Sequence, residues 1–174
     1  MMSDIQRYDQ KTTLFHWLTA GAIVILWVLG QTFSMLPRDL RPWFRSVHIL
    51  LGVALLVIMV LRVRWKFTGA RRLPPAESGL LGSLAVGMHH LLYLMVFLTL
   101  AVGLFLESLR GDLILGFIQF SPIIDNARDL SRAMYGRHGL VADGLVILAG
   151  LHACVAIWHR FVRKDGVLGR MLGG

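Results

Sequence analysis

The sequence predicts an all-α membrane protein, a bundle of four transmembrane helices in a single domain. Of its 174 residues, 56% are hydrophobic, and the mean hydropathy is +0.64. Soluble domains contain about 45–50% apolar residues. The apolar residues gather in four runs, each long enough for a membrane-spanning helix, which needs about 20 residues. We expect the helices at about 13–33, 46–66, 82–107 and 137–162 of a domain that covers residues 1–174.

The first apolar run, Leu14 to Phe33, contains no charged residue and has His16 near its start. Pro37 and Pro42 follow it, and proline cannot continue a helix without disrupting its hydrogen bonds. The run therefore predicts one complete span followed by a break. Polar residues precede the run, and it is too long for the apolar part of a signal peptide, so no cleaved signal peptide is expected.

The second and third runs are separated by a linker rich in Gly, Pro and charged residues, which is typical of a surface loop. The second run, at about 46–63, has His48 at its beginning and basic residues at its end. The third, at 80–106, is free of charge and contains the adjacent pair His89 and His90. Both runs predict spanning helices.

Residues 107–136 are polar overall and include an apolar piece too short to span. They predict a segment that lies along the membrane surface. The fourth run, 139–158, is apolar apart from Asp143 and His152, and a basic tail follows. We expect Asp143 to form structural hydrogen bonds, with proton handling as the alternative.

Four helices place both termini on the same side of a membrane. That side holds eleven Lys and Arg residues and the other side holds seven. The bias predicts cytoplasmic termini in a multi-pass protein of the bacterial inner membrane, in contact with lipid. The net charge of +8 comes with no nucleic-acid-binding motif, so no nucleic acid is expected. The single cysteine, Cys154, excludes an internal disulfide and a thiolate metal cluster.

The fourth helix and its end carry three histidines, His138, His152 and His159. The first two are fourteen residues apart, which on a helix is roughly 21 Å along the axis and about 40° around it. A histidine within a bilayer is costly unless it is paired or bound. Two histidines on one face, one near each side of the membrane, are what two stacked haems require from a shared helix.

Depth in the membrane sorts the histidines into pairs. His48 and His138 are the only candidates on the outer side, so they are expected to pair. On the inner side His152 is deep enough to hold a haem, and either His16 or His89 could be its partner on depth alone. Two axial imidazoles suit electron transfer because a six-coordinate iron has no open position. For any single histidine, the alternative is a hydrogen-bonded core or interfacial residue.

The sequence resembles the prokaryotic cytochrome b561 family. The matching motifs are FHW at His16, VHILLG and MVLR from His48, HHLLY at His89, RH at His138, GLH at His152, and WHRF with KDGVLGRML from His159. The resemblance implies a four-helix bundle with two b-type haems and their irons. Extended to the related cytochrome subunits of formate dehydrogenase and hydrogenase, it implies His48 with His138 for the outer haem and His16 with His152 for the inner one.

The resemblance also implies a ubiquinone site on the inner side, where it leaves His89 and His159 unligated. Histidine suits the protonation of a quinone because an unperturbed imidazole has a pKa of ~6.5. Alternatively, these two side chains bond haem propionates or backbone carbonyls. The sequence departs from the family pattern at His90 and in residues 107–136.

The leading hypothesis follows the small diheme members of the family. It is an enzyme that takes electrons from superoxide outside, passes them through both haems and reduces ubiquinone inside. Arg41, Arg45 and Arg137 lie closest in sequence to the outer ligands and are predicted to steer the anion, although the outer loops carry only about +2 in total. One alternative is an electron-transfer subunit between quinone and a partner dehydrogenase or a soluble cytochrome. Another is a histidine-rich metal-binding or transport protein.

Overall fold

The computed structural model describes residues 7–74, 77–111, 113–114, 118–119, 122–124 and 126–172. Four long helices form most of this part of the chain. In order, the elements are α1 (Gln10–Thr32), α2 (Arg41–Thr68), α3 (Gly79–Arg110), β1 (Leu113–Ile114), β2 (Ile118–Gln119), α4 (Arg128–Trp158), a π-helical turn η1 (His159–Arg163) and a 3₁₀ turn η2 (Leu168–Arg170). The two short strands pair antiparallel.

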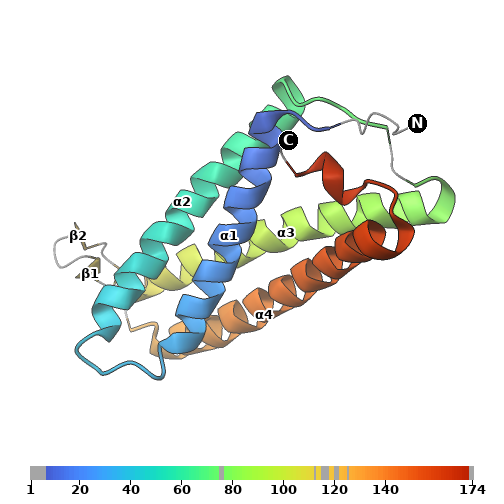
Figure 1. Ribbon diagram of the computed structural model, residues 1–174. Coiled ribbons are helices and arrows are strands. Elements are labelled where there is room, and N and C mark those ends of the chain that lie inside the picture. Colours follow the sequence, from blue (N-terminus) through green and yellow to red (C-terminus); the bar gives the residue numbers. More distant parts are fainter. Residues whose placement is uncertain are drawn as a thin grey trace.

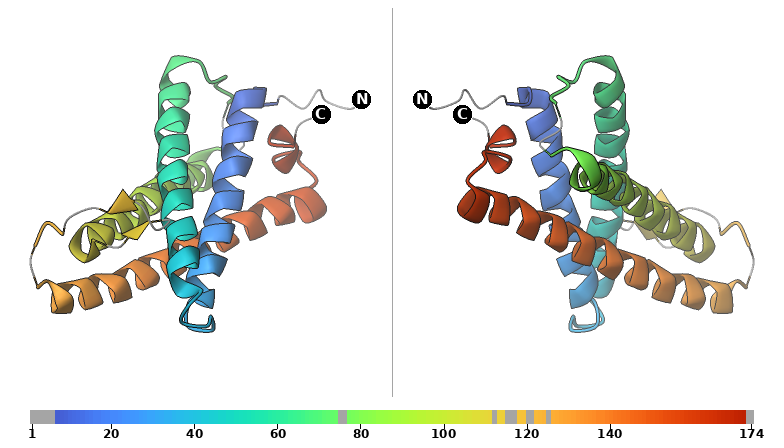
Figure 2. Two further views of the ribbon diagram at one scale, coloured as in Figure 1. Left: turned by 90° about the vertical axis from the view of Figure 1, so that its left-hand side faces the viewer. Right: turned by 90° about the vertical axis from the view of Figure 1, so that its right-hand side faces the viewer.

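The long helices are arranged as two hairpins that cross each other. Figure 1 shows α1 beside α2 and α3 beside α4, and both views in Figure 2 show the second hairpin crossing the first at a steep angle. Described residues near the two ends of the chain lie together, because the backbone N–H of Tyr8 donates to the carbonyl of Arg170 at 3.1 Å. We call the end of the bundle that carries the start of α1 and the end of α2 the terminal side, and the opposite end the far side.

All four helices are long and apolar enough to cross a membrane. The apolar core is small and joins three of them through Leu55, Met59, Val96, Leu100 and Leu145. Many other large apolar side chains face outward, such as Leu140, which is 73% exposed. Such a surface is stable in lipid rather than in water. The prediction of a four-span helical membrane bundle is therefore confirmed.

The carboxylate of Asp9 caps the start of α1 and also joins this helix to α2. Asp9 accepts hydrogen bonds from the backbone N–H of Thr12 at 2.9 Å and from the indole N–H of Trp65 at 3.1 Å. It also accepts one from the backbone N–H of Arg71. Partial burial acts to raise the pKa of Asp9, but these hydrogen bonds outweigh it and lower the pKa from 3.8 to about 2. The start of α1 is thereby fixed to the end of α2.

Helix α2 begins earlier than the sequence predicts. Its first residue is Arg41, so Pro42 lies within the first turn rather than before the helix. The first turn of a helix needs no N–H donor, so proline is tolerated there. The carbonyl of Pro42 also accepts a hydrogen bond from the hydroxyl of Ser46 at 2.9 Å. The prediction of a helix beginning at residue 46 was wrong by about one turn.

The predicted surface-hugging segment 107–136 is wrong at both ends. Helix α3 continues to Arg110 and stops at Gly111, whose left-handed φ of 61° suits glycine. Helix α4 already begins at Arg128. Polar helix ends can extend into the headgroup and aqueous layers, so the length of a polar segment does not limit a helix to the bilayer. Much of the apolar part of this segment lies outside the described residues.

Candidate functional site

Two histidines face each other near the far side of the bundle. His48 comes from the second turn of α2 and His138 from α4, and their ring centroids are 6.1 Å apart with ring planes at 83°. The Nδ1 atom of each ring is buried and makes no hydrogen bond of ordinary geometry among the described residues, although His48 approaches the backbone of Leu26 and His138 that of Thr99. A buried polar atom without a partner is costly, and it is typical of a site built for a ligand or an ion.

A glycine on α3 makes room for one of these rings. A Cβ atom added to Gly103 would lie 2.9 Å from Cε1 of His138, closer than real Cβ contacts allow. Gly30 of α1 lies next to His48. A Cβ atom added to Gly30 would lie 3.8 Å from Cε1 of His48, which is an ordinary van der Waals contact. The position of the His138 ring therefore requires a residue without a side chain at 103.

A second group of histidines lies nearer the terminal side. His16 of α1 and His152 of α4 have ring centroids 6.5 Å apart and ring planes at 69°. His89 of α3 is also close to His152, with 5.2 Å between the centroids. His90 is exposed and belongs to neither group. The structure thus brings His16, His89 and His152 together. His16 and His89, the two candidate partners of His152, both lie beside its ring.

The ring spacing tests which pairs fit a shared metal. Imidazole nitrogens bind transition metals at about 2 Å, so two rings on opposite sides of one iron have centroids about 6 Å apart. The His48–His138 and His16–His152 pairs, at 6.1 and 6.5 Å, fit this requirement. His89 and His152, at 5.2 Å, are too close for it. The residues present therefore fit a bis-histidine haem at each end of the bundle.

Two basic side chains and a tyrosine surround the terminal-side histidines. Nη2 of Arg62 lies 3.3 Å from Nδ1 of His16, and its guanidinium is over the ring of Tyr93 at 5.1 Å. Lys66 lies over the same ring at 5.0 Å. This pair of cations can bind an anionic group such as a haem propionate. The sequence did not predict this cluster, although Tyr93 follows His89 by one helical turn and Arg62 ends an apolar run.

His89 uses one ring nitrogen within its own helix. Its Nδ1 lies 2.7 Å from the carbonyl oxygen of Ala85, one turn earlier, so Nδ1 carries the proton and donates it. This is the backbone-carbonyl contact that the sequence analysis raised as an alternative. The contact leaves Nε2 as the second hydrogen-bonding atom of the ring. His89 therefore keeps one nitrogen for a ligand on the side of His152.

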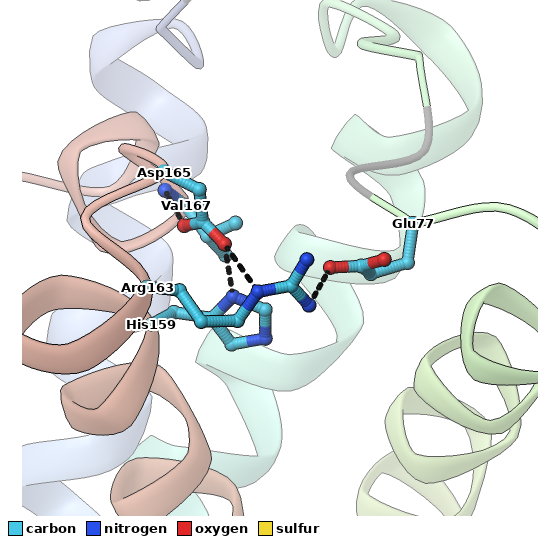
Figure 3. Close-up of polar contacts among 5 residues, drawn as sticks. All are labelled: Glu77, His159, Arg163, Asp165 and Val167. Atoms are coloured by element: carbon cyan, nitrogen blue, oxygen red, sulfur yellow. Dashed lines mark hydrogen bonds and ion pairs between the residues drawn. The ribbon is translucent and has the colours of Figure 1, made fainter.

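His159 lies in a different group of residues. It is buried, and its Nδ1 is 2.5 Å from Oδ2 of Asp165. Arg163 bonds both Asp165 and Glu77, so the group joins the end of α4 to the start of α3 (Figure 3). Among the described contacts, none connects His159 with His89. The structure therefore places the two predicted quinone residues in separate clusters on the terminal side.

Asp143 connects α4 with α1 by hydrogen bonds. Its Oδ1 accepts from the indole N–H of Trp27 at 2.8 Å and from the amide of Gln31 at 3.1 Å. A carboxylate within an apolar run is costly unless it has such partners. The contacts favour the structural role that we expected for this residue.

The three arginines predicted to steer an anion differ in their surroundings. Arg41 is half-buried and donates to the carbonyls of Leu36 at 3.0 Å and Ser34 at 3.3 Å, so it also holds the loop before α2. Arg45 is half-buried as well, whereas Arg137 is exposed, one residue before His138. All three lie on the far side, at the start of α2 or in the first turns of α4, the helices that also carry His48 and His138.

The far side also carries a shallow depression of about 330 Å³ that the sequence analysis did not predict. It is lined by Leu109, Arg110, Pro122, Ile124, Asn126, Ala127, Arg128 and Ser131. Arg110 and Arg128 belong to the ends of α3 and α4, which the sequence analysis assigned to a surface segment. Because those helix ends were not predicted, the sequence offered no reason to expect these two arginines to lie near each other.

The fold and the site define a class of protein, a helical membrane protein that presents facing histidines at two depths. The chain matches the family described as prokaryotic cytochrome b561 over residues 7–174, and it belongs to this family. It is therefore a membrane electron-transfer protein, and its family implies a b-type haem cofactor.

Curated relatives cover nearly the whole chain. A protein of Yersinia pestis named probable superoxide oxidase CybB is 29% identical over 170 residues, which is 96% of each chain. Cytochrome b561 homolog 2 of Escherichia coli is 27% identical, over 97% of this chain and 92% of its own. Cytochrome b562 of Cereibacter sphaeroides is 26% identical, over 95% and 94%.

Proposed function

We propose that this cytochrome is a superoxide:ubiquinone oxidoreductase with two b-type haems. His48 and His138 hold the haem nearer the far side, and His16 and His152 hold the one nearer the terminal side. The observation that carries the proposal is that both pairs have the ring spacing of a bis-histidine iron, 6.1 and 6.5 Å. They share α4, on which His138 and His152 lie roughly 21 Å apart along the axis.

In this proposal the terminal side faces the cytoplasm and the protein lies in a bacterial inner membrane. Eleven of the Lys and Arg residues flank the helix ends on the terminal side, against seven on the far side. Basic residues are retained on the cytoplasmic side of membrane proteins. Superoxide then arrives at the far-side pair from outside, and quinone is reduced near the terminal side.

Iron held by two imidazoles supplies reversible one-electron transfer and offers no coordination position to oxygen. Overall, two superoxide anions become two O₂, and one ubiquinone takes up two electrons and two protons to become ubiquinol. The chain supplies the remaining functions. Arg41, Arg45 and Arg137 attract the anion, and His89 and His159 contact the quinone or deliver protons to its carbonyl oxygens.

Support for superoxide as the donor comes from the relative named probable superoxide oxidase, which aligns over 96% of this chain. The names of the other two relatives state only cytochromes b561 and b562. They favour a second candidate, a membrane electron carrier between quinone and a partner dehydrogenase or a soluble cytochrome. The two candidates share the haem pairs and differ in the donor.

Superoxide is expected to reduce the haems at a rate that falls several-fold as salt rises to physiological ionic strength. Because a six-coordinate iron cannot bind the anion, transfer depends on how strongly the protein concentrates superoxide near the far-side pair. Attraction between exposed charges is screened over about 8 Å at that ionic strength. Stopped-flow absorbance at a haem band, with and without a short-chain ubiquinone, measures both half-reactions.

The double variant Arg45→Glu/Arg137→Glu should slow reduction by superoxide and leave oxidation by quinone nearly unchanged. Arg64→Glu makes the same kind of charge change at an exposed residue on the terminal side and is the matched control. If superoxide reduces the haems slowly, and neither salt nor the double variant alters the rate, the superoxide role is wrong. The quinone-linked carrier then becomes the better assignment.

A further inference from the structure

A histidine–carboxylate pair lies at the end of α4, outside the facing histidine pairs. His159 opens the π-helical turn η1 and is only 8% exposed. Its Nδ1 lies 2.5 Å from Oδ2 of Asp165. An ionised carboxylate only accepts hydrogen bonds, so Nδ1 carries the proton in this contact. Figure 3 shows the second ring nitrogen on the opposite side of the ring from Asp165.

Local backbone structure turns Asp165 back toward His159. Lys164 adopts a left-handed φ of 53°, which ends the helix and reverses the chain. The backbone N–H of Val167 then donates to Oδ1 of Asp165 at 3.2 Å. Slight burial acts to raise the pKa of Asp165, but the hydrogen bonds from His159 and Val167 and the nearby positive charges lower it below 3.8. Asp165 is therefore a carboxylate at neutral pH.

Arg163 links the pair to the start of α3. Its Nη1 bonds Oε1 of Glu77, and its Nε lies 3.6 Å from Oδ2 of Asp165. The ligand atoms of Glu77, Asp165 and His159 are within 4.8 Å of one another, a spacing compatible with a metal ion. A guanidinium that already bonds both carboxylates opposes a cation at this place. The contacts therefore favour a histidine oriented by a carboxylate over a metal site.

We propose that Asp165 is a positioning residue for quinone reduction, because it holds His159 in the tautomer and orientation that present Nε2 to a quinone carbonyl oxygen. The inference rests on the proposed function and adds a second residue to its inner site. A carboxylate that accepts from Nδ1–H fixes which nitrogen of an imidazole faces the reacting atom. The Nε of Arg163 lies 3.6 Å from the same carboxylate oxygen.

The step that this arrangement supports is a proton transfer coupled to electron uptake by the quinone. Protonated at both nitrogens, His159 gives the Nε2 proton to the carbonyl oxygen as the quinone ring takes up an electron, which superoxide supplies in the overall reaction. The Nε2–H bond breaks, its electron pair stays on nitrogen, and an O–H bond forms. The Nδ1 proton remains on the ring, bonded to Asp165, and water on the cytoplasmic side restores the proton on Nε2.

Asp165→Asn keeps the shape of the side chain but removes the carboxylate. In single-turnover mixing of reduced protein with ubiquinone, we expect the limiting rate of haem oxidation to fall about 10- to 100-fold, the size of effect found when a carboxylate that orients a metal-bound histidine is lost. The quinone concentration at half-saturation should stay within about twofold, because Asp165 does not contact the quinone. A larger solvent deuterium isotope effect should accompany the slower rate, since proton delivery then limits it.

Two further measurements separate positioning from general damage. Glu77→Gln weakens the contact with Arg163 but leaves the pair of His159 and Asp165, so it is the matched control and should keep the limiting rate within about twofold. ¹⁵N NMR of histidine-labelled protein reads the tautomer of His159 without any turnover. The wild type should show a protonated Nδ1, and Asp165→Asn should shift this signal toward a mixture of tautomers.

The proposal is overturned if Asp165→Asn oxidises at the wild-type rate or keeps the wild-type ¹⁵N signals. It is also overturned if Glu77→Gln loses as much activity as Asp165→Asn, because the cluster then acts only by holding the fold together. If ubiquinone fails to oxidise wild-type haems, the quinone reaction and this inference fall together. If superoxide fails to reduce the haems while the quinone results hold, only the donor in the proposed function is wrong.

Discussion

His48→Ala and His138→Ala are each expected to remove the same haem and to leave the other one bound. Their rings face each other at 6.1 Å from two different helices, so loss of either ring removes one of the two side chains that would hold this haem. Each variant should therefore lose about half of the bound haem. Absorption spectra combined with a redox titration distinguish the two haems and measure which one is missing.

The complementary variants are His16→Ala and His152→Ala, which should both remove the second haem. His90→Ala is the control, because this histidine is exposed and outside both groups. Size-exclusion chromatography checks that each variant remains folded. The pairing is wrong if His48→Ala and His138→Ala remove different haems. Loss of a haem in a His89→Ala variant, with retention in His16→Ala, would instead pair His89 with His152.

His159→Ala should leave both haem spectra nearly intact and slow the oxidation of reduced haems by ubiquinone about 100-fold or more. The ring bonds Asp165 and lies outside both facing pairs, so its removal spares the haem ligands. General acid catalysis typically contributes 10²- to 10⁴-fold to a rate. Single-turnover absorbance with varied ubiquinone measures the effect, and reduction by superoxide should proceed at the wild-type rate.

A loss of the terminal-side haem in His159→Ala would identify His159 as a ligand and would remove His16 from that role. The exposed residue His90 again provides a comparison, since it is another histidine near the terminal side. If His159→Ala and His90→Ala oxidise equally fast, His159 takes no part in quinone reduction. Asp165 would then lose its proposed role as well.

The sequence predicts the number of helices because each span requires a long apolar run, and all four runs are present. It also predicts that His138 and His152 share a face, because helical geometry alone fixes that relation. The helix ends were less predictable. Pro42 was interpreted as a break but lies in a first turn, and the many polar residues within 128–137 concealed the start of α4.

Some contacts at the site could not be predicted from the sequence because they depend on how helices pack and how the chain turns. Arg62 of α2 contacts His16 of α1, and no sequence periodicity predicts a contact between side chains of different helices. Asp165 follows His159 by only six residues, but a π-helical turn and a left-handed residue are needed to bring it back to the ring. Depth alone left His16 and His89 as alternatives, and the ring spacings to His152 favour His16.

The number of haems per chain is the measurement that tests the central claim most directly. A pyridine haemochrome assay on the purified protein, with protein quantified by amino-acid analysis, counts b-type haems without assuming any ligand. Two facing histidine pairs, both with the spacing of a bis-histidine iron, predict two haems per chain, low-spin in the intact protein. One haem per chain, or none, would contradict the account.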